Sequence, residues 1–128
     1  MEKKKIYYWS PFLSKIATCR SVINSAKALN DFSSKYESFI LNFFGEFNTH
    51  NAEIKKKNIN ILNHYKINLS KYLPYKGKIK SRFSFLVFFF LGYFPLRNVI
   101  KKHQPEFLVI HLITSLPLIL LILNNFNT

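Results

Sequence analysis

The residues best placed to bind a ligand stand at the ends of two apolar runs. Ser10 and Pro11 follow the first run, and His111, Thr114 and Ser115 end and follow the most apolar run of the chain. Hydroxyl and imidazole groups donate and accept hydrogen bonds, so these side chains could hold a polar ligand. Each also has a structural interpretation. Ser10 and Pro11 could form only a turn, and His111 could be a satisfied structural histidine. Thr114 and Ser115 could cap a helix.

Other kinds of site are excluded by composition. The single cysteine, Cys19, excludes a disulfide framework and a cysteine-based zinc site. The 3 glycines stand far apart, so no Gly-rich phosphate loop can be written from them. His50, His64 and His103 do not have metal-ligand spacing. We therefore expect no cofactor and no metal, and no residue is singled out as catalytic.

The chain is strongly basic. Its 128 residues include 19 Lys and Arg against 6 Asp and Glu, a formal net charge of +13. Most of this charge is expected on a solvated surface, and the remainder favours anionic partners such as phospholipid headgroups or phosphorylated ligands. The arginines are scattered, which argues against nucleic acid as a partner. With 48% hydrophobic residues, the chain is expected to bury a core.

Apolar periodicity and turn residues indicate an α/β chain in the order strand, helix, strand, strand, helix, strand, helix. The strands are expected at 6–9, 38–44, 58–62 and 107–112. The helices are expected at 17–30, from 81 and from 115. A surface loop is expected at 46–57 and an irregular connection at 64–80. Pro95 is expected to kink or restart the second helix. This order predicts an open parallel Rossmann-like sheet with strand order 3-2-1-4, left incomplete at the outer edge of the fourth strand.

That topology brings the candidate residues together. The first and fourth strands are neighbours in a 3-2-1-4 sheet, and their carboxyl ends meet at one edge. We therefore expect the loops that begin at Ser10 and at His111 to line one crevice.

Two apolar stretches, 83–96 and 107–123, could instead be membrane helices, although a spanning helix needs roughly 20 apolar residues. The first stretch is apolar nearly all round, which indicates burial on several sides or contact with lipid. Its most regular apolar face consists of Phe83, Leu86, Val87, Phe90 and Phe94. The alternative function is thus a small basic membrane protein with two spanning helices.

Three segments resemble one enzyme family. They are the opening KIYYWSP at 5–11, the helix 17–29, and IKKHQPEFLVIH at 100–111, with SLPL at 115–118 after it. The third segment is similar to a helix, a K-x-x-x-P-D motif and a hydrophobic strand ending in histidine, as found in bacterial glycosyltransferase family 4 enzymes. Glu106 stands where that family usually has Asp, and the first loop lacks the family's glycines.

The resemblance implies a GT-B fold, in which two Rossmann-like domains face a cleft. Residues 1–128 would be a single, incomplete acceptor-side domain, and the donor-binding C-terminal domain would be absent. The full-length enzyme would move a sugar from a nucleotide-sugar donor to a membrane-linked glycan or lipid acceptor in surface polysaccharide biosynthesis, and this chain alone would be inactive. The substrate-binding side chains of this chain would offer hydrogen bonds to sugar hydroxyls; they are Ser10, Pro11, His111, Thr114 and Ser115. The expected location is cytoplasmic and peripheral at the inner membrane, with an anionic membrane surface as a partner and no nucleic acid.

Overall fold

The computed structural model describes residues 3–11, 17–65, 67–74, 76–111 and 116–123. Its centre is a sheet of four strands, β1 (Lys4–Trp9), β2 (Tyr36–Asn42), β3 (Asn60–Asn63) and β4 (Phe107–Ile110). Neighbouring strands are parallel and lie in the order β3-β2-β1-β4. The predicted α/β class, the parallel Rossmann-like sheet and the strand order 3-2-1-4 are therefore confirmed.

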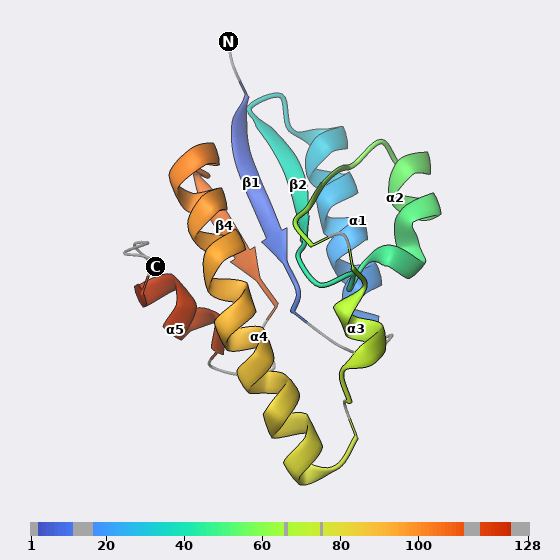
Figure 1. Ribbon diagram of the computed structural model, residues 1–128. Helices are drawn as coiled ribbons and strands as arrows, with labels where there is room; N and C mark the ends of the chain where they lie inside the picture. Colours follow the sequence, from blue (N-terminus) through green and yellow to red (C-terminus); the bar gives the residue numbers. More distant parts are fainter. Residues whose placement is uncertain (1–2, 12–16, 66, 75, 112–115, 124–128) are drawn as a thin grey trace.

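Helices cover both faces of this sheet (Figure 1). They are α1 (Ala17–Phe32), α2 (Asn51–Lys56), α3 (Leu69–Tyr72), α4 (Lys78–Asn98) and α5 (Leu116–Leu123). One face carries α1 and α2, and the other carries α4 and α5. The last turn of α4 widens into a π-helical segment, Val99–His103, that leads to β4.

Side chains of β1 alternate between two hydrophobic cores because successive residues of a strand point to opposite faces. Tyr8 belongs to the core under α1, together with Val22 and Ile23. Trp9 belongs to the core under α4, together with Phe88. A strand buried on both faces is typical of the centre of a parallel sheet, and this burial explains the continuous apolar run at the start of the chain.

The connection between β2 and β3 differs from the predicted surface loop at 46–57. It contains a 3-10 turn, Asn48–His50, followed by α2, whose Ile54 is buried in the core under α1. The side chain of Lys57 also donates a hydrogen bond of 2.8 Å to Glu53, one turn away. Parallel strands require a crossover connection, usually through a helix, so a helix here is what the parallel pairing of β2 with β3 demands.

The helix α4 begins at Lys78, slightly before the predicted start, and it continues through Pro95 to Asn98. Pro95 therefore does not restart the helix. The irregular connection predicted before it contains the short helix α3. Ser84 explains part of the earlier start, because its buried hydroxyl donates a hydrogen bond of 2.6 Å to the carbonyl oxygen of Pro74 and ties the helix to that connection.

The buried face of α4 is not the most regular apolar face of its sequence. The helix buries Phe88, whose ring lies 4.2 Å from that of Phe44, and Gly92, which faces Leu120 of α5. The outward face is apolar and exposed, and it carries Ile79, Phe83, Leu86, Phe90 and Phe94. We call these five residues the outer stripe of α4.

Among the described residues, one helical stretch, Lys78–His103, is long and apolar enough to cross a membrane when judged by length and composition. One third of an apolar 18-residue window in this stretch is buried inside the domain, on the face that packs on the sheet. The second span of the alternative, 107–123, is not one helix. Phe107–Ile110 is strand β4, which pairs with β1 from Ile6 to Trp9.

Candidate functional site

The carboxyl ends of β1 and β4 lie side by side. Trp9 pairs with Ile110, and the backbone N–H of His111 donates a hydrogen bond of 3.0 Å to the carbonyl oxygen of Trp9. Ser10 and His111 consequently follow neighbouring strands at the same edge of the sheet. Open parallel sheets bind ligands at this edge, because loops and helix N-termini gather there.

Of the predicted binding residues, Ser10, Pro11 and His111 lie at this edge, and their role in binding stays a prediction. Ser10 is fully buried, and its Oγ makes no hydrogen bond within the described part of the chain. Pro11 and His111 are half-buried. Thr114 and Ser115 lie outside the described residues. A buried hydroxyl without a partner costs about 1–3 kcal/mol, so Ser10 is a group that a ligand hydrogen bond would stabilise.

A buried acid lies just beyond the carboxyl end of β2. Glu46 is 8% exposed, and its Oε2 accepts a hydrogen bond of 2.9 Å from the backbone N–H of Phe44. Burial raises the pKa of Glu46 to about 8, against the opposing effect of nearby backbone N–H groups and the Trp9 side chain. At neutral pH the carboxyl group is therefore protonated, and it can donate as well as accept a hydrogen bond.

Glu46 is not among the predicted site residues, because residues 46–57 were expected to form a polar surface loop. The available signal was the apolar surroundings of this residue, Phe43, Phe44 and Phe47, which are all fully buried. A single acid inside such a run is a candidate for burial rather than for solvent exposure.

Trp9 completes a set of polar atoms at this edge. Its indole N–H lies close enough to Glu46 to lower the pKa of that carboxyl group, but the two groups do not have hydrogen-bonding geometry. Trp9 Nε1, Ser10 Oγ and Glu46 Oε1 are thus buried atoms that lack a hydrogen-bond partner within the described residues. An indole N–H, a hydroxyl and a protonated carboxyl group are all uncharged, and each can pair with a hydroxyl group.

A network of asparagine side chains holds the neighbouring strand ends in place. Asn42 donates hydrogen bonds to Asn48 at 2.8 Å and to Asn63 at 2.6 Å, and its own carbonyl accepts one of 3.0 Å from the backbone N–H of Phe47. Between these residues Gly45 turns the chain with φ +86°, a conformation that side chains other than glycine rarely adopt. The ends of β2 and β3 are therefore fixed at the same edge as Ser10 and His111.

No group of three or more His, Cys, Asp or Glu residues suited to hold a metal ion occurs in the described part of the chain. Comparison of the chain with protein-family models, with curated proteins and with solved structures gives no significant match.

Proposed function

We propose that this chain is the acceptor-side domain of a glycosyltransferase that moves a sugar from a nucleotide-sugar donor to a glycan or lipid-linked acceptor. The observation that carries the proposal is a group of buried polar atoms without hydrogen-bond partners among the described residues, at the edge of the sheet where the strands have their carboxyl ends. These atoms are Trp9 Nε1, Ser10 Oγ and Glu46 Oε1. Sugar hydroxyls would supply the hydrogen bonds that these atoms lack. The resemblance of residues 5–11 and 100–111 to glycosyltransferase family 4 supports the same assignment.

The neutrality of these groups favours the acceptor over the donor. In sugar transfer from a nucleotide donor, the main electrostatic task is to stabilise the departing diphosphate, which requires cations or well-placed N–H groups. A protonated Glu46 and a serine hydroxyl suit hydroxyl groups better than a diphosphate. The donor would therefore be held by other parts of the enzyme, and residues 1–128 alone are expected to transfer no sugar.

We further propose that the domain lies against the cytoplasmic face of the inner membrane. The outer stripe of α4 exposes its aromatic rings, with Phe83 60% and Phe90 66% exposed, while the opposite face of the helix packs on the domain. The first turns of the helix carry the cations Lys78, Lys80 and Arg82. An apolar face beside cations is typical of helices that lie in the membrane interface next to anionic headgroups.

The binding proposal is tested with the chain's single tryptophan, because Trp9 is part of the site. The fluorescence of Trp9 and the backbone NMR shifts of Ser10 and His111 are followed while uncharged disaccharides and oligosaccharides are added. A binding glycan is expected to produce a saturable change in both signals. Nucleotide sugars alone are expected to leave these residues unchanged.

The variant Ser10→Ala removes the unpartnered hydroxyl and is expected to weaken glycan binding about two- to tenfold, the effect of one neutral hydrogen bond. The free energy of unfolding should not fall, because the lost hydroxyl makes no hydrogen bond within the described residues. Ser21→Ala, at an exposed position of α1, is the matched control and should bind like the parent chain. The proposal is overturned if no glycan binds at Ser10 and His111, or if the isolated chain turns over a nucleotide sugar.

A further inference from the structure

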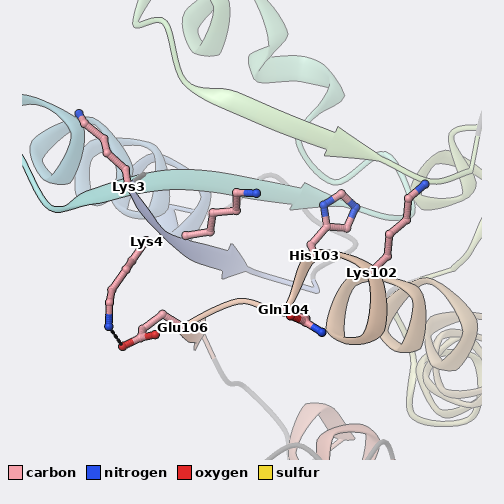
Figure 2. Close-up of a pocket in the computed structure, with 7 residues that line it drawn as sticks. Lys3, Lys4, Lys102, His103, Gln104 and Glu106 are labelled. Atoms are coloured by element: carbon pink, nitrogen blue, oxygen red, sulfur yellow. Dashed lines mark hydrogen bonds and ion pairs between the residues drawn. The ribbon is translucent and has the colours of Figure 1, made fainter. Parts of the chain in front are cut away.

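A basic pocket lies at the opposite edge of the sheet from the candidate site. It has a volume of about 360 Å³ and is lined by Lys3, Lys4, Lys5, Lys102, His103, Gln104 and Glu106. Figure 2 shows that the lining comes from the start of β1, from the end of the π-helical segment after α4, and from the residue before β4. We name it the amino-edge pocket.

The pocket holds more positive charge than its own acid can neutralise. Glu106 forms an ion pair with Lys4, with Nζ and Oε1 separated by 2.6 Å (Figure 2). Lys3, Lys5 and Lys102 make no ion pair with a carboxylate in the described part of the chain. Three ammonium groups therefore remain available to a ligand.

The lysine charges of the pocket act on the imidazole of His103. Partial burial, followed by the charges of Lys102 and Lys5, lowers the pKa of His103 from its ordinary value. The ring of Tyr7 is a further titratable neighbour, with its centroid 6.0 Å from that of the imidazole. Lys5 and Lys102, which come from separate elements, thus act on one imidazole, and both line the same pocket as this imidazole.

The end of a helix explains only part of this charge. Cations favour a helix C-terminus because they interact with the helix dipole, and Lys102 and His103 occupy such a position. Lys5 comes from strand β1 and has no such reason to be there. The main chain holds the two elements together, since the backbone N–H of Glu106 donates a hydrogen bond of 2.9 Å to the carbonyl oxygen of Lys5.

We infer that the amino-edge pocket binds a phosphate group carrying at least two negative charges. Lys5 and Lys102, whose charges both act on His103, would neutralise the anion, and His103 would become protonated in its presence. Lysines bind phosphate as point charges, without the bidentate geometry of arginine, so the pocket would select charge rather than one particular compound. The phosphate could belong to a free diphosphate or to a lipid headgroup. This inference does not depend on the acceptor role of the opposite edge, which concerns uncharged hydroxyls.

The experiment follows the titration of His103 by NMR in the full chain, with His50, His64 and His111 as internal references. One arm adds inorganic diphosphate, a second adds monomeric dihexanoyl phosphatidic acid, and a third adds chloride at the same ionic strength. A saturable rise in the pKa of His103 with diphosphate supports a site for a free ligand. A rise with the lipid analogue alone supports the same site with a headgroup as its source.

The double variant Lys5→Gln/Lys102→Gln is expected to weaken binding about tenfold or more, because it removes two charged contacts to one anion. Lys56→Gln/Lys71→Gln changes the net charge equally at exposed positions outside the pocket and should bind like the parent chain. The inference is overturned if neither phosphate compound moves the pKa of His103 beyond the chloride control. It is equally overturned if both double variants weaken binding to the same extent.

Discussion

The backbone N–H of Phe44 donates a hydrogen bond of 2.9 Å to Oε2 of Glu46, and this bond connects the end of β2 to a carboxyl group that is 8% exposed. Because burial raises the pKa of Glu46 to about 8, the folded chain retains a proton that the unfolded chain releases above the ordinary glutamate pKa of 4.5. Stability must therefore fall as the pH rises between these two values.

The first prediction concerns this pH dependence. Between pH 6.5 and pH 8 the free energy of unfolding should fall by about 1.5 kcal/mol, since one bound proton amounts to about 1.4 kcal/mol per pH unit and the folded chain releases half of it by pH 8. This window lies above the lowered pKa of His103, whose effect on stability has the opposite sign. Urea unfolding followed by circular dichroism measures the change.

Glu46→Gln should keep an acceptor for the N–H of Phe44 and remove the decline in stability over the same pH window. Glu37→Gln, whose carboxylate accepts a hydrogen bond from Asn60 at an exposed position, should retain the decline. Equal pH dependence in the parent chain and in Glu46→Gln would show that Glu46 is not the titrating group.

The second prediction separates a steric clash from backbone strain. Gly45 (φ +86°) and Gly77 (φ +94°) both adopt conformations that are strained for other residues, so alanine at either position should cost about 1–3 kcal/mol of stability. A Cβ atom at Gly45 would also lie 2.5 Å from Oδ1 of Asn68, whereas one at Gly77 would meet nothing within 4 Å. Gly45→Ala should therefore be the more destabilising variant in urea unfolding, and equal losses would contradict the described turn.

The third prediction tests which face of α4 is buried. Phe88 is 5% exposed and packs on Phe44, so Phe88→Ala should cost about 3–5 kcal/mol. Phe90 lies two residues further on and is 66% exposed, so Phe90→Ala should cost less than about 0.5 kcal/mol. Thermal unfolding of the two variants measures these losses of stability. A larger loss in Phe90→Ala than in Phe88→Ala would mean that α4 is rotated about its axis.

The fourth prediction concerns the membrane surface. Phe83→Ser/Phe90→Ser should weaken sedimentation with phosphatidylglycerol vesicles about tenfold or more, because each exposed ring contributes apolar area to the membrane contact. Phe32→Ser is the matched control, since Phe32 is 91% exposed at the end of α1 on the other side of the sheet. Binding should also weaken at high salt. An equal loss in Phe32→Ser would point to unspecific hydrophobic adsorption.

The sheet could be predicted from the sequence because two of its strands, β1 and β4, are recognisable from their own short apolar runs. The runs at 6–9 and 107–110 are continuous and apolar, as central parallel strands require, and their order follows from the helices between them. The positions of Ser10 and His111 at one edge follow from that order alone. The role of these residues was not decided by the sequence, because a turn, a cap and a binding site use the same residue types.

Features that depend on distant packing escaped prediction. Glu46 is polar in sequence, and only the closure of three phenylalanines around it shows that it is buried. The outer stripe of α4 has more regular apolar spacing than the buried face, so periodicity alone does not identify the side that packs on the sheet. The buried face is set by contacts with distant residues, since Phe88 packs on Phe44 and Gly92 faces Leu120, and no local pattern shows these contacts.

The central position of β1 has a consequence for how the chain reaches its native state. Its strand neighbours come from distant parts of the sequence, since Ile6 pairs with Ser38 on one side and with Phe107 on the other. During synthesis β1 is made about a hundred residues before its second neighbour, β4, and non-local pairing of this kind slows folding. The nascent chain must therefore carry an apolar, half-paired strand until β4 has been made, which makes it a candidate client for a holding chaperone.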